Sequence, residues 1–313
     1  MTMKVHYGYE ELNLKDPVIT MGIFDGVHRG HCLLIERVVN EARRCGSEAV
    51  VVTFDPHPRI VLDDNPEKLR FLTDIDERIY LLGKMDIDHL VIIPFTRELS
   101  NLTACEFIEN ILCKKLKVSH LVAGFNHHFG KRHEGTGETI AECSQKFGFN
   151  LTRADALSEG GIIISSSVIR GLLNEGKVED AERLLGYPYF VTGKVVTGQK
   201  IGRNLGFPTA NIEPSFRHKL IPSRGVYAVE VQICDSCEKL MAMVNIGNRP
   251  TITGGQGADT IEAHLINFSG DLYGREIRII FRYRLRDEKK FGSVDDLVNQ
   301  INADMKRTVL LLG

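Results

Sequence analysis

Three glycines and two histidines are concentrated in residues 22–31 (GIFDGVHRGH), where a short apolar run turns into a helical pattern. The unpaired backbone N–H groups at the start of a helix, together with the positive end of the helix dipole, attract anions. Glycine lets a backbone approach a phosphate closely, and His28 and His31 lie on one side of the first helical turn. Both imidazoles can donate to phosphate oxygens. The spacing predicts a phosphate-binding turn, the alternative being a loop with structurally satisfied histidines.

A second anion-binding pattern occupies residues 164–170 (ISSSVIR). The hydroxyls of Ser165, Ser166 and Ser167 stand at the expected start of a helix, and Arg170 offers a planar fork of donors. Serines alone would be a helix cap in most proteins. Together with the turn at residues 22–31, called the histidine turn below, they indicate a second set of phosphate contacts.

Two further turns follow strand-like runs, at residues 53–59 (TFDPHPR) and 124–130 (GFNHHFG). Ligands bind at the C-terminal ends of strands in open α/β sheets, so both turns are candidate ligand contacts. The nearby residues His127, His128 and His133 could suggest a metal cluster. No cysteine or carboxylate set with ligand spacing accompanies them, and a metal site is not expected there.

The C-terminal part has a different chemistry. Residues 193–200 (GKVVTGQK) are a near miss to a Walker A loop, but no Ser or Thr follows the lysine and no helix follows the loop, which argues against a P-loop. Thr209 and Asn211 flank one residue of an extended segment, so both point to one face and can bind Mg²⁺ with phosphate oxygens. Cys234 and Cys237 lack a second pair for zinc and are expected to be thiols in a hairpin loop.

The elements that must position the first group of residues alternate along the first 185 residues, as in a parallel α/β sheet. Strands are expected at residues 18–24, 49–54, 90–95 and 121–124. A helix with Leu34, Val38 and Ala42 on one face follows the first strand, and capping boxes are expected at Thr73 and Thr103. Two more helices are expected, from about residue 167 and at residues 178–185.

Near residues 186–189 the sequence pattern changes from alternating strands and helices to short strands, which predicts domains at 1–186 and 187–313. Short strands separated by turn residues suggest an antiparallel sandwich or small barrel. These strands are expected at residues 190–197, 226–233, 240–246, 260–268 and 276–283. A last helix capped by Ser293 has apolar residues at helical spacing, namely Leu297, Ile301, Met305 and Val309.

The composition is that of an ordinary globular protein with about two domains. The chain has 313 residues, of which 43% are hydrophobic and 26% charged, and its net charge is −2. This balance excludes a polybasic nucleic-acid coat. No apolar run approaches the ~18 residues that span a bilayer, and the N-terminus lacks the apolar region of a signal peptide. We therefore expect a cytoplasmic protein without a membrane or nucleic-acid partner, whose seven cysteines are reduced thiols.

The N-terminal motifs resemble those of a known enzyme group. H-x-G-H after a strand resembles the H-x-G-H nucleotidyltransferase superfamily, and ISSSVIR resembles its I-S-S-[ST]-x-I-R segment. TFDPHPR is similar to the T-F-x-P-H-P-R element of bacterial FAD synthetases. GFNHHFG matches in part: the family usually has G-x-D-F-x-F-G, so Asn126 replaces the aspartate and His127 a phenylalanine.

This resemblance implies an α/β Rossmann-like nucleotidyltransferase domain that transfers an adenylyl group from ATP to FMN and releases pyrophosphate. It implies that His28, His31 and Arg170 are catalytic. The implied ATP contacts are Gly22, Phe24, Asp25, Gly26, Gly30, Ser165, Ser166 and Ser167. The implied FMN contacts are His57, Pro58, Arg59 and Asn126.

Four C-terminal motifs resemble flavokinase, the riboflavin kinase module. They lie at residues 198–211, 244–251, 261–265 and 270–274. The resemblance implies an antiparallel β-barrel with a C-terminal helix, in which Glu262 is the base for the riboflavin 5′-hydroxyl and Thr209 and Asn211 bind Mg²⁺. The implied ATP contacts are Gly198, Gly202, Pro208, Thr209 and Asn211. The implied flavin contacts are Arg286, Glu288 and Phe291, of which Phe291 could equally be a core residue.

Together the resemblances cover residues 15–310 and imply a bifunctional riboflavin kinase/FAD synthetase. Riboflavin and ATP would give FMN in the C-terminal domain, and FMN with a second ATP would give FAD in the N-terminal domain, with Mg²⁺ as cofactor. The substitutions at Asn126 and His127 leave open a monofunctional riboflavin kinase with a degenerate N-terminal domain. A non-catalytic flavin-binding regulator is a further alternative, and self-association is left open.

Overall fold

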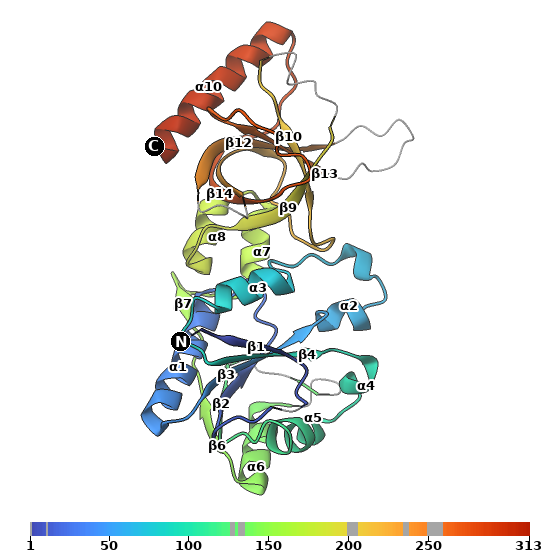
Figure 1. Cartoon of the computed structure of the whole chain (residues 1–313), viewed down its shortest axis with the longest axis vertical. Helices are drawn as coiled ribbons and strands as arrows, with labels where there is room; N and C mark the ends of the chain where they lie inside the picture. The colour runs from blue at the N-terminus through green and yellow to red at the C-terminus, as the bar shows by residue number, and fades with distance from the viewer. Residues whose placement is uncertain are drawn as a thin grey trace. The chain divides into compact units, whose positions relative to one another are not determined.

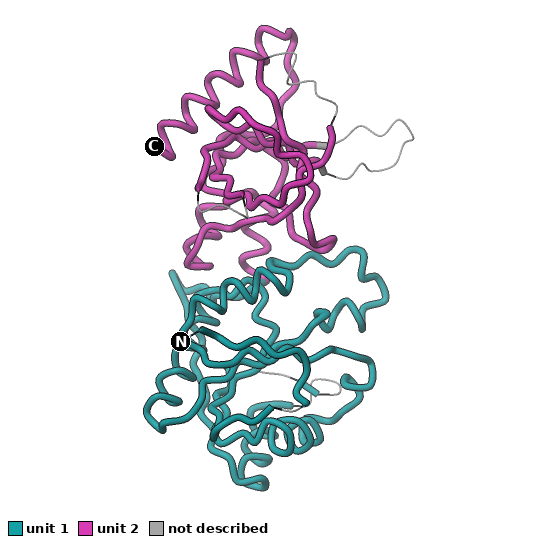
Figure 2. Tube along the Cα trace, in the orientation of Figure 1, with its two compact units in different colours: residues 1–166 teal, residues 167–313 magenta. Residues whose placement is uncertain are grey.

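The computed structural model describes residues 2–10, 12–125, 129–130, 135–198, 206–233, 238–248 and 259–313. The chain separates into two compact units, residues 1–166 and 167–313 (Figure 2). This division lies about twenty residues before the composition change near residue 186. The domain limits 1–186 and 187–313 stay a prediction, and the two units are described separately below.

Unit 1 is built on a six-stranded sheet in the order β1-β4-β3-β2-β5-β6, and every neighbouring pair is parallel. Its strands are β1 (Lys4–Tyr7), β2 (Val18–Met21), β3 (Ala49–Asp55), β4 (His89–Pro94), β5 (His120–Ala123) and β6 (Asn150–Arg153). The central strands β2, β3, β4 and β5 are buried along nearly their whole length, as expected for parallel strands. The parallel α/β class expected from the sequence is confirmed.

The connections between these strands are mostly helical (Figure 1). They are α1 (Arg29–Cys45), α2 (Pro58–Leu62), the 3₁₀ turn η1 (Pro66–Lys68), α3 (Ile75–Leu82), α4 (Arg97–Ser100), α5 (Ala104–Phe107), the π-helical η2 (Ile108–Cys113) and α6 (Gly137–Phe147). Leu34, Val38 and Ala42 of α1 are buried, as their spacing predicts, and α1 packs on β2, β3 and β5. A short hairpin, β7 (Ser158–Glu159) and β8 (Ile162–Ile163), precedes the end of the unit.

Two local expectations in unit 1 differ from the structure. The edge strands β1 and β6 were not expected, because half of their residues are exposed and they lack a long apolar run. The cap of α3 is Asp74, with Glu77 completing the capping box, so the prediction of Thr73 as cap is wrong. Thr73 is engaged elsewhere, because its hydroxyl accepts a hydrogen bond from the Gly26 amide. The capping box at Thr103 is confirmed.

Unit 2 begins with α7 (Ser166–Asn174, whose first residue belongs to unit 1) and α8 (Val178–Leu185), both close to their predicted positions. These helices are attached to the barrel that follows. Arg284 donates to the Glu175 carbonyl and to the Ser223 hydroxyl, each at 2.8 Å, and Ser223 donates its amide to the Leu173 carbonyl. Arg282 pairs with Glu182 at 3.5 Å. The helix pair therefore folds with the barrel.

The barrel is closed and antiparallel, with strand order β10-β13-β12-β11-β14-β9 and β9 pairing with β10. Its strands are β9 (Phe190–Val196), β10 (Ala210–Pro214), β11 (Gly225–Ile233), β12 (Lys239–Asn248), β13 (Asp259–Leu265) and β14 (Glu276–Arg286). The barrel prediction is confirmed. The strand β10 was not among the expected strands, although its residues were expected to be extended.

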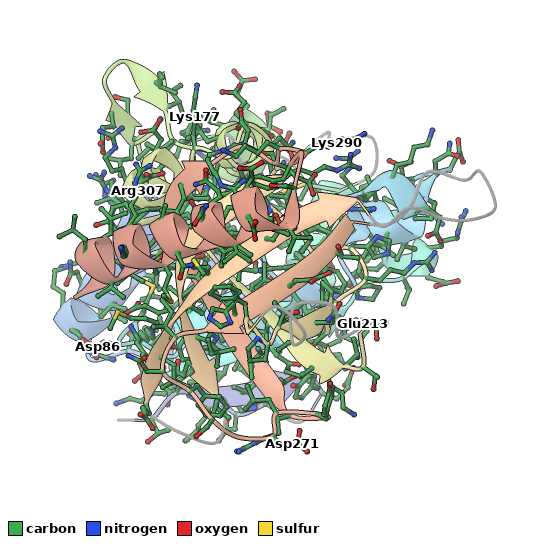
Figure 3. All side chains as sticks on the ribbon, turned by 90° about the horizontal axis from the view of Figure 1, so that it is seen from above. Asp86, Lys177, Glu213, Asp271, Lys290 and Arg307 are labelled. Carbon is green, nitrogen blue, oxygen red and sulfur yellow. A yellow bond between two sulfur atoms is a disulfide. The ribbon has the colours of Figure 1, made fainter. Side chains whose placement is uncertain are left out.

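The C-terminal helix α10 (Val294–Leu312) lies against β11, β12 and β14 on the outside of the barrel (Figures 1 and 3). Its Ser293 cap is confirmed. Its fully buried positions are the polar residues Asp304 and Thr308, whereas Val309 is exposed, so the apolar face predicted through Val309 is wrong at that residue. Charged side chains of both signs cover the surface of the two units, for example Asp86, Lys177, Glu213, Asp271, Lys290 and Arg307 (Figure 3).

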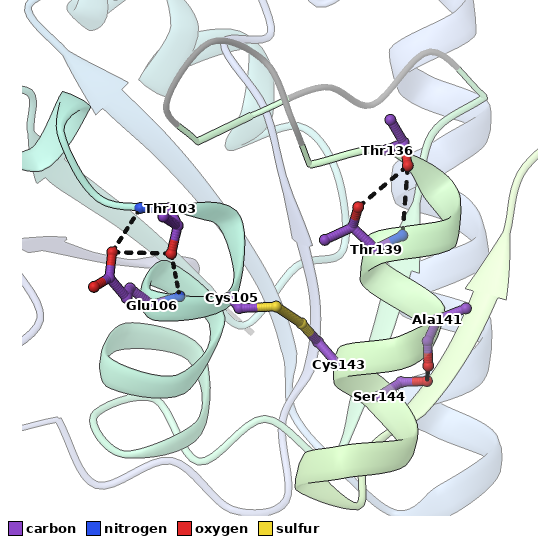
Figure 4. The surroundings of a disulfide bond; sticks show 8 residues. All are labelled: Thr103, Cys105, Glu106, Thr136, Thr139, Ala141, Cys143 and Ser144. Carbon is purple, nitrogen blue, oxygen red and sulfur yellow. Dashed lines mark hydrogen bonds between the residues drawn. A yellow bond between two sulfur atoms is a disulfide. The ribbon is translucent and has the colours of Figure 1, made fainter.

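A disulfide joins Cys105 of α5 to Cys143 of α6 (Figure 4). The expectation that all cysteines are reduced thiols is wrong for this pair. The two cysteines are 38 residues apart, and only the packing of α5 on α6 brings them together. Cys32, Cys45 and Cys113 are free, and Cys234 and Cys237 lie outside the described residues.

No helix in the described part of the chain is both long enough and apolar enough to cross a membrane.

Candidate functional site

The phosphate-binding turn predicted in unit 1 connects the end of β2 to the start of α1. Its backbone is unusual, because Phe24, Gly26 and Val27 have φ angles of 52°, 82° and 35°. Left-handed backbone costs of order 1–3 kcal/mol at a residue other than glycine. The side chains of Phe24 and Val27 are both buried, and this packing holds the turn in its strained shape. Strain of this kind is concentrated at functional sites.

The two histidines of the turn are stacked on each other, with ring centroids 3.6 Å apart. His28 caps α1, because its Nδ1 accepts the amide N–H of His31 at 3.3 Å. In the neutral ring this leaves Nε2 of His28 as the donor nitrogen. The edge of Phe24 lies against His31, at a centroid distance of 5.2 Å. The two histidines therefore lie on one side of the helix start, as their spacing predicts, and their action on a phosphate stays a prediction.

The surroundings of His31 favour the neutral form of its ring. Burial, and secondly the neighbouring His28, hold the pKa of His31 well below its usual value of 6.5. Its Nδ1 is buried and has no hydrogen-bond partner among the described residues. Buried polar atoms are normally hydrogen-bonded, so this nitrogen has an unmet capacity that a ligand can satisfy.

Part of the serine segment lies on the histidine turn. Ser166 donates its hydroxyl to the carbonyl of Asp25 at 2.8 Å, and a Cβ added to Gly30 would lie 3.7 Å from the carbonyl of Ile164. The helix expected to open at this segment begins at Ser166. Farther along α7, in unit 2, Arg170 donates to the Ser167 hydroxyl at 3.0 Å. The structure thus joins Ser166 directly to the turn.

Asp25 has a structural role in the turn. Its carboxylate is buried and accepts the amide protons of Leu72 and Thr73, at 2.8 and 3.0 Å, and the Thr73 hydroxyl at 3.3 Å. These bonds tie the turn to the segment before α3. The expectation that Asp25 contacts ATP remains a prediction, as it does for Gly22, Phe24, Gly26, Gly30 and Ser165.

The predicted FMN contacts lie where β3 ends. The Asp55–Pro56 peptide bond is cis, and His57 caps the short helix α2 by accepting the amide of Arg59 at 3.1 Å. The ring of His57 stacks on Phe71 with centroids 4.0 Å apart. Arg59 is exposed and pairs with Asp63 at 3.3 Å, and Pro58 is the first residue of α2. The other predicted contact, Asn126, lies outside the described residues, as do His127, His128 and His133.

In unit 2, three polar side chains lie side by side on neighbouring strands. Glu262 of β13 pairs in register with Asn211 of β10 on one side and with Asn245 of β12 on the other. Thr209 donates its hydroxyl to Oε2 of Glu262 at 3.5 Å. Thr209 and Asn211 from one motif and Glu262 from another are therefore adjacent. Asn245 lies in the motif at residues 244–251, and only the strand register places it beside Glu262.

Two glycines lie against the row of side chains formed by Asn211, Glu262 and Asn245. A Cβ added to Gly198 would overlap the side-chain amide of Asn211 and lie 2.8 Å from its Oδ1, so Asn211 lies directly over Gly198. A Cβ added to Gly247 would meet the carboxylate of Glu288 and lie 3.1 Å from Nδ2 of Asn245. Glu288, a predicted flavin contact, thus lies beside the same row. Gly202 lies outside the described residues, and Pro208 accepts a hydrogen bond from His264 at 2.9 Å.

Arg286, the other charged flavin contact expected in unit 2, is anchored to α10. Its Nε donates to Oδ2 of Asp304 at 2.9 Å, and Gln300 donates to Oδ1 of the same carboxylate at 2.8 Å. The guanidinium of Arg286 lies over the ring of Phe291, 5.7 Å from its centroid. Asp304 was missed by the sequence reasoning, because an aspartate in the middle of an amphipathic helix is indistinguishable from a surface charge.

The oxygen donors of the row suit magnesium. Mg²⁺ prefers hard oxygen ligands and is usually bound by one or two protein groups together with substrate phosphates. A threonine hydroxyl, an asparagine amide and a nearby carboxylate provide such donors at Thr209, Asn211 and Glu262. No cluster of three or more His, Cys, Asp or Glu side chains that could hold a metal occurs in the part of the chain that the structure describes.

Unit 1 has a parallel α/β sheet with a histidine turn at a helix start, and unit 2 is a barrel with a carboxylate beside donors that suit magnesium. These features define the class of two-unit phosphorus-transfer enzymes. Family models agree with each part, FAD synthetase matching residues 10–168 and riboflavin kinase matching residues 185–312. The chain belongs to the bifunctional riboflavin kinase/FMN adenylyltransferase family. The family resemblance stated from the motifs is therefore confirmed.

Individual relatives support this membership. The chain is 37% identical over 287 residues to the bifunctional riboflavin kinase/FMN adenylyltransferase of Escherichia coli K12, covering 92% of this chain and 90% of the relative. It is 36% identical to that of Listeria monocytogenes, covering 93% and 91%. A crystal structure from Streptococcus pneumoniae described as a macrolide-efflux protein has a TM-score of 0.87 and 30% identity, over 98% of this chain and 99% of the other.

Proposed function

We propose that the barrel unit phosphorylates riboflavin to FMN and that the α/β unit adenylylates FMN to FAD, each reaction using its own ATP. Family membership supports both activities. The single observation that carries the assignment of the first reaction is the row of Asn211, Glu262 and Asn245 across three adjacent strands, with Thr209 at its side. Three separate motifs meet there around one carboxylate.

In the kinase reaction, Glu262 removes the proton from the riboflavin 5′-hydroxyl as the oxygen attacks the γ-phosphorus of ATP, and ADP leaves. A hydroxyl is a poor nucleophile, so a positioned base is needed. Thr209 and Asn211 orient the phosphate oxygens and would hold Mg²⁺, which when bound neutralises charge on the transferred group. Gly198 and Pro208 are proposed as ATP contacts. Glu288 and Phe291 face the flavin, and Arg286 holds the segment that carries them.

In the adenylylation reaction, the FMN phosphate attacks the α-phosphorus of ATP and pyrophosphate leaves. The attacking phosphate is already anionic and needs no base. The task of the protein is to align the two substrates and to stabilise the charge that moves onto pyrophosphate. His28 and His31 act as hydrogen-bond donors at the helix start, and we include Arg170 and the serine hydroxyls as further phosphate contacts. A bound triphosphate would raise the pKa of His31 from its depressed value, because an adjacent anion favours the protonated ring.

The test is a product assay with the whole chain, riboflavin, Mg²⁺ and ATP, followed by chromatographic separation of flavins. FMN and FAD should both appear, and they should fail to appear when Mg²⁺ is chelated. Glu262→Gln should abolish FMN formation while FMN supplied directly is still converted to FAD, and His31→Ala should do the reverse. Formation of FMN without FAD by the wild-type chain would instead favour a monofunctional riboflavin kinase. Equal loss of both activities in both variants would contradict the assignment of residues to reactions. The use of ATP also supports the expected cytoplasmic location.

A further inference from the structure

Arg78 of α3 belongs to none of the motifs that the proposed function uses, yet it is one of the few buried charged residues of unit 1. Its side chain is only 3% exposed. α3 follows α2 and η1 in the connection from β3 to β4, and Thr73, just before α3, lies against the histidine turn at the end of β2. A buried guanidinium must be surrounded by acceptors, because burial without partners is costly. Its partners therefore indicate what it does.

The guanidinium of Arg78 contacts the ends of both strands that carry predicted chemistry. One nitrogen, Nη1, donates to the carbonyl of Ile23 at 2.9 Å, to the hydroxyl of Thr53 at 3.0 Å and to the carbonyl of Phe54 at 3.2 Å. Nη2 reaches the carboxylate of Asp55 at 3.4 Å. Ile23 immediately precedes the strained Phe24 of the histidine turn. Phe54 and Asp55 immediately precede the turn with His57.

Other residues of the same segment hold the same two turns. We call residues 71–78 (FLTDIDER) the bracket segment. Thr73 accepts the Gly26 amide at 2.9 Å and donates to Asp25, which fixes the histidine turn. Phe71 stacks on His57 with ring centroids 4.0 Å apart, which fixes the turn at residues 54–59. The bracket segment thus touches both turns, and Arg78 contacts the two of them with one planar group.

The electrostatics favour a geometric role for Arg78. Burial lowers its pKa below the ordinary value, an effect opposed mainly by Asp55. Burial also raises the pKa of Asp55, and Arg78 opposes that shift. Most of the oxygens that Arg78 meets are carbonyl or hydroxyl groups rather than carboxylates. A planar fork of donors that meets several neutral acceptors fixes directions and distances more than it neutralises charge.

We propose that Arg78 is a positioning residue for adenylyl transfer, which sets the separation between the histidine turn that holds ATP and the turn at residues 54–59 that holds FMN. This inference rests on the proposed assignment of the two turns. A bimolecular displacement between two bound substrates depends steeply on their alignment, and a shift of about 1 Å can cost ~10²-fold in rate.

The test uses the full chain and measures FMN-to-FAD conversion, with riboflavin phosphorylation by the same molecules as an internal control. Arg78→Met should lower kcat for FAD formation by roughly 30- to 100-fold, with smaller changes in KM for FMN and for ATP. Arg78→Lys should recover part of the loss, since it restores the charge but not the fork. FMN formation should stay within about twofold of the wild type.

Two further variants separate positioning from stability. Thr53→Val removes the hydroxyl that Arg78 and the Ile23 carbonyl share, keeps the side-chain shape, and should lower the same kcat by a smaller factor. Arg43→Met is the matched control, because Arg43 also links distant segments of unit 1, through Asp88 and the carbonyl of Asp86, away from the two turns. It should leave kcat for FAD formation unchanged.

The outcomes distinguish a failure of the positioning role of Arg78 from a failure of the proposed function. If the wild type forms FAD but Arg78→Met keeps its kcat, the positioning role is overturned and the proposed function stands. If Arg78→Met and Arg43→Met reduce FAD formation equally and in proportion to a loss of thermal stability, Arg78 is merely structural and the proposal is also overturned. A wild-type chain that forms no FAD would overturn both the proposal and the assignment on which it rests.

Discussion

Replacing Gly198 with alanine tests whether the position of Asn211 controls riboflavin phosphorylation. An added methyl group would overlap the side-chain amide of Asn211 and lie 2.8 Å from its Oδ1, against 3.4–4 Å for an ordinary contact. The backbone of Gly198 lies beneath the side chain, so Asn211 must swing away. Because Asn211 is the cross-strand neighbour of Glu262, this movement disturbs the row next to the predicted base.

The expected magnitude follows from this displacement. Clearing the overlap requires a movement of about 1 Å, which at a reacting centre costs roughly 10²-fold in rate. That factor corresponds to about 2.7 kcal/mol of lost transition-state stabilisation. The free energy of unfolding of the barrel should change much less, because the substitution removes no buried methylene group. The variant should therefore be folded but slow.

The assay compares kcat/KM for riboflavin phosphorylation with FMN adenylylation in the same preparation, and only the first should fall. Gly171→Ala is the matched control, because Gly171 is an exposed residue of α7 whose added methyl group meets no atom within 4 Å. It should leave the kinase rate unchanged. If Gly198 acts through Asn211, the double variant Gly198→Ala/Asn211→Ala should be no slower than Asn211→Ala alone. Independent, additive losses would refute the reasoning.

Three further predictions concern stability. Asp304→Asn weakens the charge-assisted bond to Arg286 and should destabilise the barrel unit by about 2 kcal/mol and raise KM for riboflavin, which thermal unfolding and kinase kinetics would check. The pKa of His31 in the folded chain lies well below its unfolded value of about 6.5, so below that pH the unfolded chain binds a proton that the folded chain does not. Unit 1 should therefore lose stability as the pH falls below about 6.5, by up to ~1.4 kcal/mol per pH unit. Melting curves from pH 7.5 to 5.5 should show this loss, and His31→Gln should flatten it; an unchanged slope would contradict the assignment. Without reductant, Cys105→Ser should lower the stability of unit 1 by about 2–4 kcal/mol, because it opens the loop to Cys143, and adding reductant should weaken the wild type but not the variant.

Much of the fold could be predicted because its signals are local. Buried parallel strands such as β3 and β4 are continuous apolar runs, and helix caps such as Thr103 and Ser293 are short patterns. The edge strands β1 and β6 are not predicted, because a half-exposed strand has neither a long apolar run nor a strict alternation. Similarly, the cap of α3 was misplaced by one residue because Thr73 and Asp74 are both good caps. Only the tertiary bond from Gly26 to Thr73 decides between them.

The candidate sites show the same division. The motif residues were found because glycines, histidines and serines at helix starts are recognisable in one dimension, and the adjacency of Thr209, Asn211 and Glu262 agrees with their separate predictions. Arg78 and Asp304 were missed because a charged residue on a helix gives no sign of being buried. Arg78 is 55 residues from its partner Ile23, and Asp304 is 18 residues from its partner Arg286. The disulfide was missed for the same reason, since spacing says nothing about which helices meet.

The attachment of α7 and α8 to the barrel has a consequence for how such chains can be divided. The two family matches leave residues 169–184 unclaimed, and this interval contains most of both helices. A gene cut after residue 168 would separate the serine motif from the rest of its helix. A cut before residue 185 would separate the helices from Arg284 and Arg282, whose contacts hold them. The two catalytic halves are therefore not interchangeable cassettes. A free-standing first half that kept these helices would need other contacts to replace those of the barrel, and recombination between relatives should favour junctions that keep the helices with the second half.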